Sequence, residues 1–267
     1  DRLEVQAFFY WVYRASIGVH MHWNGSLAQC LPGTTSLAYE EATIRRVNYY
    51  RAMAGLPGDV TLDPVWNAKC QAAAQMMSAQ GELSHYPDSS WACYSEDGEE
   101  AAHRSNLAAG SAGPEAIDDY IADLGKYNYF VGHRRWILYP RQKVMGTGSV
   151  PPSQLGNTYY WRANALWVVG GFGDRPATPE WVAWPPEGYV PYQVVYPRWS
   201  FSYPRADFTG ADITMSESGT PVSLTILALD KNDRGYADNT LVWEPSGLPS
   251  GPPAADTTYT VSISDVV

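Results

Sequence analysis

The chain is poor in cysteine, in basic residues and in long apolar runs. Its 267 residues include three cysteines, and 18 Lys and Arg against 28 Asp and Glu give a formal net charge of -10. No stretch reaches the roughly 18 apolar residues that a membrane-spanning helix needs, so we expect no membrane span. An acidic surface repels phosphate backbones, and nucleic acid is therefore not an expected partner.

Several catalytic signatures are also missing. The sequence contains no GxSxG nucleophile elbow, no HExxH zinc motif, no GxxxxGK[ST] phosphate loop and no GxGxxG dinucleotide turn. The segment Asp1–Val5 lacks a basic region followed by an apolar one, so we expect a mature chain or one made without a signal peptide. Any chemistry must come from polar residues outside these motifs.

The three cysteines predict one disulfide. They share no CxxC spacing, which argues against a zinc ribbon, and three cysteines allow at most one bridge within the chain. Cys70 lies on the apolar stripe of a predicted helix, where a lone cysteine is usually a small buried hydrophobic residue. Cys30 and Cys93 both lie in loop-like sequence. By elimination we predict a Cys30–Cys93 disulfide.

The first half of the chain has helical patterns. Residues 1–33 form an N-terminal extension, and its aromatic run at 8–13 is expected to pack on the main domain because so many exposed rings would be costly. Four helices are predicted from caps and apolar spacing. They cover 37–54 after a Ser36 cap, 64–80 after Asp63 and before Gly81, 99–109, and 114–124.

The second half has strand patterns. Short alternating segments lie at 213–215, 222–226, 241–243 and 259–263, separated by turn residues, with a polar hairpin turn expected at 230–235. Such spacing favours a small immunoglobulin-like or fibronectin-like β-sandwich. We therefore divide the chain into an extension at 1–33, a main domain at 34–178 and a β-sandwich domain at 179–267.

Two histidines lie in distinctive sequence. His85 follows the second predicted helix in LSHYP, and His133 lies in GHRRWIL. Taken singly, each is more typical of a structural histidine that donates a core hydrogen bond than of a ligand. The sequence motifs that contain these two histidines give further evidence about their role.

Six motifs appear in one order over residues 36 to about 175. They read RRVNYYR at 45–51, LDPVWN at 62–67, LSH at 83–85, NLAAG at 106–110, GHRRWILYP at 132–140 and MGTG at 145–148. In this order and spacing the sequence resembles the CAP superfamily of cysteine-rich secretory, antigen 5 and pathogenesis-related proteins. The fifth motif is similar to GHRxNILxP of the bacterial secreted SCP-like branch.

The resemblance implies an α+β fold, a CAP-type α-β-α sandwich with a central antiparallel sheet, here followed by the β-sandwich. It also implies a cleft where two histidines and two acids meet, which binds divalent metal in some members. His85 and His133 match the histidines, and Asp123 falls where the family usually has glutamate. Ser105 stands where the second acid is expected, and serine supplies no negative charge.

Two chemistries could use these residues. His85, His133 and Asp123, with water, would make a first shell for zinc or another divalent metal. Alternatively, a hydrolase could use a histidine as general base on Ser105, oriented by Asp123, which makes all four residues catalytic candidates. Glu99, Glu100 or His103 could replace the missing acid, although a solvated helix face that complements the helix dipole explains them better. No organic cofactor is expected.

We therefore expect a secreted or cell-surface, non-enzymatic CAP protein whose two-histidine cleft binds a divalent metal or small ligand. The alternatives are an extracellular hydrolase, metal- or serine-dependent, and a cell-wall carbohydrate-binding module. The carbohydrate-binding alternative rests on aromatic residues that could stack on sugars or, instead, pack against the first domain. These are Trp181, Trp184, Tyr189, Tyr192, Tyr196 and Trp199. The partner would be a small ligand or a cell-surface component.

Overall fold

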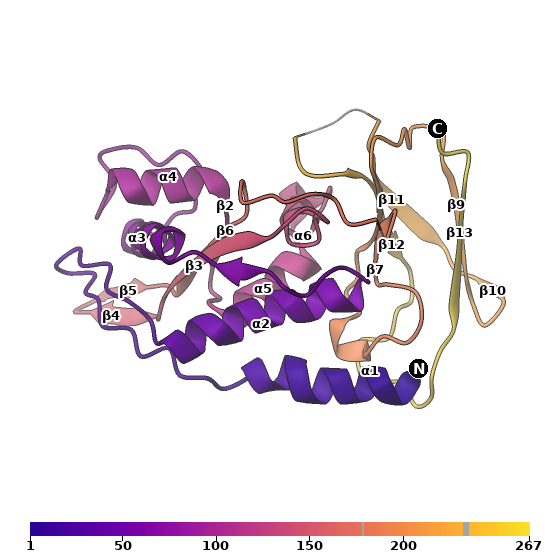
Figure 1. Ribbon diagram of the computed structural model, residues 1–267, viewed down its shortest axis with the longest axis horizontal. Coiled ribbons are helices and arrows are strands. Elements are labelled where there is room, and N and C mark those ends of the chain that lie inside the picture. Colours follow the sequence, from indigo (N-terminus) through magenta and orange to yellow (C-terminus); the bar gives the residue numbers. More distant parts are fainter. Residues whose placement is uncertain (178, 232–234) are drawn as a thin grey trace.

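The computed structural model describes residues 1–177, 179–231 and 235–267. It has the predicted α+β architecture, in which an α-β-α sandwich is followed by a β-sandwich region (Figure 1). The boundary predicted at residue 178, and residues 232–234 of the predicted polar turn, lie outside the described residues.

The N-terminal segment is helical. It comprises α1 (Arg2–Phe8), the π-helical turn η1 (Phe9–Tyr13) and the short 3-10 helix η2 (Arg14–Ser16). In Figure 1 it runs alongside α2 (Leu37–Met53). The rings of Phe8 and Tyr49 stack with centroids 5.2 Å apart, and the Arg46 guanidinium lies 3.6 Å from the ring centroid of Tyr13. One face of the aromatic run therefore packs on the main domain.

The first two predicted helices begin where their caps indicated. Ser36 accepts a hydrogen bond from the Tyr39 N–H at the start of α2. Asp63 accepts from the N–H groups of Val65 and Trp66 at the start of α3 (Pro64–Gln80). Gly81 ends α3 in the left-handed conformation, which glycine adopts without steric cost. Local signals determined these ends.

The central sheet has the strand order β1-β3-β6-β2. Its strands are β1 (Thr61–Leu62), β3 (Val144–Val150), β6 (Ala163–Trp167) and β2 (Ser105–Ala109). The short edge strand β1 is parallel to β3, and the other pairs are antiparallel. Trp167 is paired with Ser105 on one side and with Gly146 on the other.

Alternation along β6 separates two cores. Ala163, Ala165 and Trp167 belong to the core formed with α3 and α4 (Glu96–Arg104). Leu166, between them, belongs to the core formed with α2 and α5 (Pro114–Ala122). Because successive side chains of a strand point to opposite faces, the sheet is covered by helices on both sides.

Helix α3 lies directly on the backbone of β3. A Cβ added at Gly148 would lie 2.1 Å from the Gln71 backbone nitrogen, so this position requires glycine. The Gln71 side chain accepts from the Ser149 N–H and donates to the Ser149 carbonyl, at 3.0 and 2.8 Å. The Asn67 side chain accepts from the Thr147 N–H at 2.8 Å. The helix therefore satisfies the part of the β3 edge beyond the short β1.

The helix predicted at 99–109 is wrong over its second half. The structure ends α4 at Arg104, and residues 105–109 form β2, paired with β6. This pairing joins segments about 60 residues apart, which local helical spacing cannot reveal. The short helix α6 (Gly132–Ile137) was not predicted from the sequence.

The C-terminal region consists of two facing sheets. One has the order β11-β12-β8-β7, and the other has the order β10-β9-β13. The predicted strands at 213–215, 241–243 and 259–263 lie within β9 (Asp212–Glu217), β12 (Asn239–Pro245) and β13 (Tyr259–Ser264), and the strand predicted at 222–226 overlaps β11 (Leu224–Leu229). Buried Trp199, Phe208, Met215, Leu241 and Trp243 form the core between them. The remaining strands of this region are β7 (Val182–Trp184), β8 (Trp199–Tyr203) and β10 (Thr220–Pro221). A separate hairpin of β4 (Ser153–Leu155) and β5 (Thr158–Tyr160) lies between β3 and β6 in the chain.

Buried contacts join the two regions. The Trp184 ring lies 5.1 Å from the Tyr50 ring, within one core. The Tyr50 and Tyr196 hydroxyls are 2.7 Å apart. Arg135 and Asp230 form a buried ion pair at 2.8 Å. The C-terminal region therefore packs closely against the first domain.

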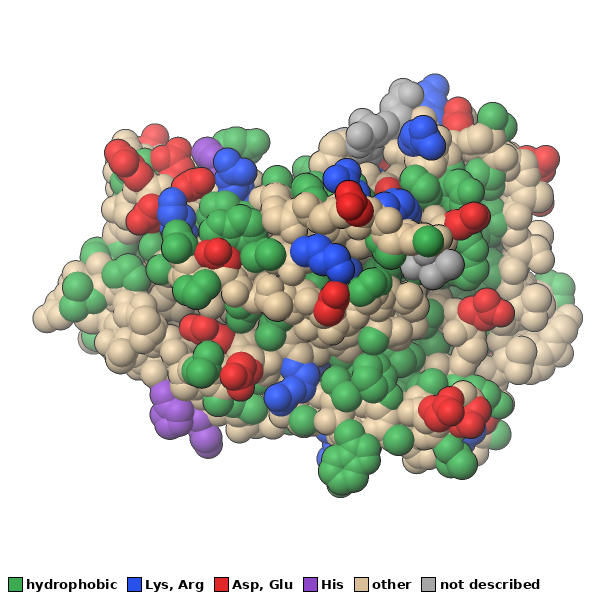
Figure 2. All heavy atoms as spheres, viewed as in Figure 1, with side chains coloured by type: hydrophobic (Ala, Val, Ile, Leu, Met, Phe, Trp, Pro, Cys, Tyr) green, Lys and Arg blue, Asp and Glu red, His purple; other side chains and the backbone are tan. Residues whose placement is uncertain are grey.

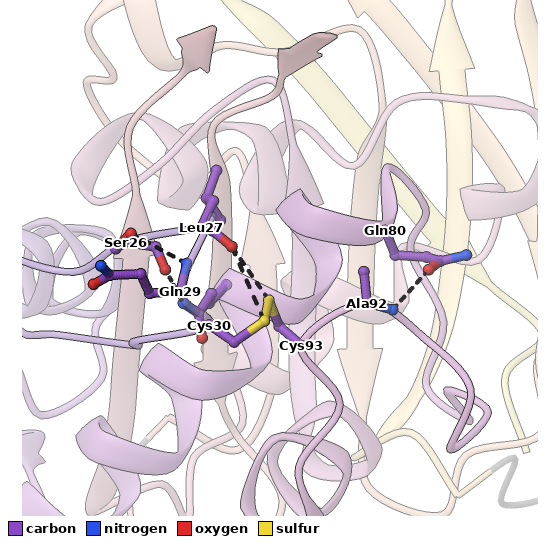
Figure 3. Close-up of a disulfide and its surroundings, with 8 residues drawn as sticks. Ser26, Leu27, Gln29, Cys30, Gln80, Ala92 and Cys93 are labelled. Carbon is purple, nitrogen blue, oxygen red and sulfur yellow. Dashed lines mark hydrogen bonds between the residues drawn. A yellow bond between two sulfur atoms is a disulfide. The ribbon is translucent and has the colours of Figure 1, made fainter. Parts of the chain in front are cut away.

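The predicted Cys30–Cys93 disulfide is confirmed (Figure 3). It joins the segment before α2 to the loop before α4, and the Cys93 sulfur lies 3.5 Å from the Leu27 carbonyl oxygen. Cys70 is free and buried on α3, as expected. Burial raises the pKa of its thiol to about 12, which makes it unreactive as a nucleophile.

Candidate functional site

His133 is held by Asp123. Its Nδ1 atom lies 2.7 Å from Oδ1 of Asp123. An ionised carboxylate can only accept a hydrogen bond, so Nδ1 carries the proton. In the neutral ring, Nε2 then keeps its lone pair for a ligand. The His133 side chain retains 24% of its exposure, whereas that of Asp123 has none.

Asp123 occupies a constrained position at the end of α5. It is the C-terminal cap and has φ of 50°, in the left-handed region that is uncommon for residues other than glycine. Its Oδ2 atom accepts from the Arg134 N–H at 3.2 Å. Its carbonyl accepts from the guanidinium of Arg198. Both carboxylate oxygens thus have partners within the protein, so Asp123 orients His133.

Arg134 of α6 and Arg198 of the C-terminal region support this site. Arg134 donates to the carbonyls of Ile121 and Ala122 and to the Ser200 hydroxyl, at 2.6, 3.3 and 2.9 Å. It is fully buried, and this burial lowers the pKa of its guanidinium to about 10. Because Ser200 and Arg198 belong to the C-terminal region, that region helps to fix the end of α5.

His85, in the loop after α3, repeats the pattern. Its Nδ1 atom lies 2.8 Å from the Ala102 carbonyl oxygen on α4. A carbonyl only accepts, so Nδ1 is again the donor and Nε2 of the neutral ring is the available atom. The two histidines predicted from the motifs therefore share one tautomeric arrangement.

Ser105 is not arranged as a nucleophile. It is buried at the start of β2, with its Oγ 3.7 Å from the Cys70 Sγ. The next residue, Asn106, donates its side-chain amide to the His133 carbonyl at 3.0 Å. Within the described residues, no hydrogen bond joins Ser105 to either histidine.

The acids considered as replacements lie on the outer face of α4. Glu99 accepts from the Tyr94 hydroxyl and lies 3.8 Å from Nε2 of His103. Glu100 pairs with Lys69. These partners fit a helix face laced with polar contacts, and they leave the replacement of the missing acid unsupported.

The donor atoms available for a metal are those of two imidazoles. Over residues 1–177, 179–231 and 235–267, no group of three or more His, Cys, Asp or Glu side chains could hold a metal ion. Metal-binding histidines usually donate their second nitrogen to a carboxylate or carbonyl, as His133 and His85 do. Each ring is therefore anchored in the way a metal-binding histidine is, with Asp123 behind His133, and the binding of one ion by both rings stays a prediction. The three-ligand set stays a prediction.

The aromatic residues proposed for carbohydrate binding divide into two groups. Trp184 and Trp199 are buried, so for them the predicted role in sugar stacking is wrong. Trp184 instead donates its indole N–H to the Val194 carbonyl at 3.2 Å. Tyr196 is half-buried and packs with the same core as Trp184, whereas Trp181, Tyr189 and Tyr192 are exposed. Trp184 fits the packing alternative, because it belongs to the core that joins the C-terminal region to the first domain. Trp199 belongs to the core between the two C-terminal sheets.

Two supporting residues were missed by sequence reasoning. Arg134 lies beside His133, but only the pairing of two arginines was visible in the motif. Arg198 is 75 residues from Asp123. The Asp123–Leu124–Gly125 ending of α5 was the one available signal, since aspartate tolerates the left-handed conformation that ends helices.

A family model described as the cysteine-rich secretory protein family, CAP, matches residues 44–169. Neither a curated protein nor a solved structure matches the chain. The matched span contains His85, Ser105, Asp123 and His133. Within the part of the chain that the structure describes, no helix has the length and apolar character needed to cross a membrane.

Proposed function

The chain belongs to the CAP family through residues 44–169, and from this premise we propose a secreted, non-enzymatic protein whose His85–His133 site binds a divalent metal or a small ligand. The observation that carries the proposal is the matched anchoring of the two rings. Each Nδ1 faces an oxygen acceptor, at 2.7 Å from Asp123 and 2.8 Å from Ala102. Each neutral ring therefore offers Nε2.

Fixed neutral imidazoles suit a divalent metal such as zinc. His85 and His133 would supply two nitrogen ligands, and water would complete the coordination. The bound ion would supply a positive charge that attracts anionic or carbonyl groups. Asp123 would keep the His133 ring oriented and make its free nitrogen more basic. The serine at position 105 supplies no anionic ligand, so we expect weaker metal binding than in a three-ligand site.

A binding role is favoured over hydrolysis because Ser105 lacks a base. Activation of a serine needs a histidine within hydrogen-bonding reach, about 2.6–3.2 Å. Ser105 instead lies beside the Cys70 thiol. Ser105→Ala should therefore leave ligand binding unchanged, and esterase or protease substrates should be turned over no faster by the wild type than by this variant.

Secretion is supported by the disulfide. Disulfides persist in oxidising compartments such as the extracellular space, and they are rare where thiols are kept reduced. The bond between Cys30 and Cys93 closes a sequence separation of 63 residues. An extracellular protein with exposed rings at Trp181, Tyr189 and Tyr192 could contact a cell-surface component.

Isothermal titration with Zn²⁺ tests the metal proposal. The parent protein should carry His20→Gln and His22→Gln, which leaves three histidines. Its titration is compared with that of the same protein carrying His85→Gln and His133→Gln, and with a His103→Gln control. Saturable heat that only the cleft substitutions abolish supports the proposal. No heat in the parent, or equal heat in all three proteins, contradicts metal binding at this site.

A further inference from the structure

Two histidines outside the cleft stand side by side on the surface. The rings of His20 and His22 have centroids 5.6 Å apart and planes inclined by 49°. Both residues are exposed. In Figure 2 a purple histidine patch projects at the lower left, where the segment between α1 and α2 runs in Figure 1. This pair lies outside the span matched by the family model.

Hydrogen bonds hold the backbone of the segment that carries His20 and His22. The Ser36 hydroxyl donates to the His20 carbonyl at 2.9 Å, and the Ser36 N–H donates to the Met21 carbonyl at 2.8 Å. The Trp23 indole N–H donates to the Pro32 carbonyl at 2.7 Å. The two imidazoles are therefore presented by an ordered segment tied to the cap of α2.

His22 adopts an unusual conformation. Its φ is 48°, in the left-handed region that few residues other than glycine occupy. Such a conformation persists where the surroundings impose it. Here it occurs at one member of the ring pair.

The ring separation is close to that required for chelation. Two imidazole nitrogens at roughly 2.0–2.1 Å from one ion, with an angle of about 90–110° between them, place the ring centres about 4.5–5.2 Å apart. The observed 5.6 Å is slightly longer. A small rotation of exposed side chains closes this difference without moving the backbone.

We propose that His20 and His22 form a two-imidazole site for a late first-row divalent cation, with water filling the other coordination positions. Imidazole nitrogens suit Cu²⁺, Ni²⁺ and Zn²⁺, and among these the divalent series places Cu²⁺ first in affinity. The formal net charge of -10 favours accumulation of cations near the surface. The proposal is independent of the His85–His133 site.

The five histidines of the chain allow a complete set of controls. Cu²⁺ is titrated into the untagged full chain, and binding is followed by calorimetry and by electron paramagnetic resonance. The variants are His20→Gln, His22→Gln, His103→Gln and the double variant His85→Gln/His133→Gln. Melting curves check that each is folded, which we expect because His20 and His22 are exposed.

The wild type should bind one Cu²⁺ at this pair, with hyperfine coupling from two nitrogens. Loss of either ring removes the advantage of joined ligands, so affinity should fall about 100-fold or more in His20→Gln and in His22→Gln. His103→Gln should keep the affinity of this pair, and the cleft double variant should lose only the additional binding at His85 and His133, with the affinity of the His20–His22 pair unchanged. Unchanged Cu²⁺ affinity in His20→Gln or His22→Gln, or no saturable binding by the wild type, would overturn the proposal.

Discussion

The carboxylate of Asp123 lies 2.7 Å from Nδ1 of His133 and is itself fully buried. Its second oxygen accepts from the Arg134 N–H, so both carboxylate oxygens are engaged within the protein and Asp123 orients the imidazole. His85 reaches the same arrangement with the Ala102 carbonyl. Each of the two predicted histidines is thus oriented through Nδ1 by an oxygen acceptor.

Asp123→Asn should weaken the site without removing either ring. The neutral amide can still contact His133, but it withdraws the negative charge that makes Nε2 basic. We expect Zn²⁺ affinity to fall about 10- to 100-fold, as is typical for outer-shell partners of metal-binding histidines. Calorimetry measures the change, with Ser105→Ala as the control. Equal affinities in Asp123→Asn and wild type would contradict the orienting role.

Arg198→Met should destabilise the protein and weaken the site together. Arg198 donates to the Asp123 carbonyl and pairs with Glu244 at 2.9 Å, which links the C-terminal region to the end of α5. Losing hydrogen bonds to a charged group at a buried position should cost about 1.5–3 kcal/mol of unfolding free energy. Denaturant unfolding measures this value.

The matched control for Arg198 is Lys143→Met. Lys143 pairs with Asp59 at 3.1 Å on the surface, where such pairs contribute about 0–1 kcal/mol. If both substitutions cost the same, the Arg198 contacts contribute no more than a surface ion pair. Ligand affinity unchanged in Arg198→Met would remove the proposed coupling between the regions.

Stability should decrease as pH rises above about 10, the ordinary pKa of tyrosine. Burial raises the pKa of Tyr50 and of Tyr196 well above this value. Between the unfolded and folded pKa values, the unfolded state loses these protons while the folded state keeps them. Each group should then lower the unfolding free energy by about 1.4 kcal/mol per pH unit.

Unfolding curves at several alkaline pH values, with absorbance at the tyrosinate band, check this expectation. The hydroxyl pair of Tyr50 and Tyr196 should ionise only on unfolding. Tyr50→Phe should reduce the pH dependence. An unfolding free energy that stays constant or rises across this interval would show that the hydroxyl pair does not resist ionisation.

Gly148→Ala should be strongly destabilising. Its Cβ would meet the α3 backbone at Gln71, which cannot move without breaking the bonds to Ser149. Overpacking of this kind costs about 1–3 kcal/mol or more. Gly251→Ala is the control, because a Cβ there meets no atom within 4 Å. Similar unfolding free energies for the two variants would mean that α3 yields at this contact.

Local signals predicted the features that depend on neighbouring residues. Ser36, Asp63 and Gly81 mark helix ends because their side chains or backbone satisfy groups within the same turn. The disulfide followed from the small number of cysteines. The order of motifs indicated the fold, since six short segments matched in sequence.

Features that depend on distant partners could not be predicted. Residues 105–109 are helix-compatible in composition and become a strand by pairing with β6. Asp123 was assigned as a ligand by position, and only its contacts with His133 and Arg134 show its orienting role. The sequence around Trp184 did not indicate that its ring packs against the ring of Tyr50.

Long-range ¹H–¹⁵N correlation spectra of histidine-labelled protein, recorded during Zn²⁺ titration, test most directly whether His85 and His133 bind through Nε2. They resolve each of the five histidines, so any response of His20 and His22 is separated from that of the cleft. We predict that Nδ1 of His85 and His133 is protonated before Zn²⁺ is added and that both Nε2 resonances shift in a saturable way. Cleft histidines that remain unchanged at saturating Zn²⁺, or that bind through Nδ1, would contradict metal binding through these nitrogens.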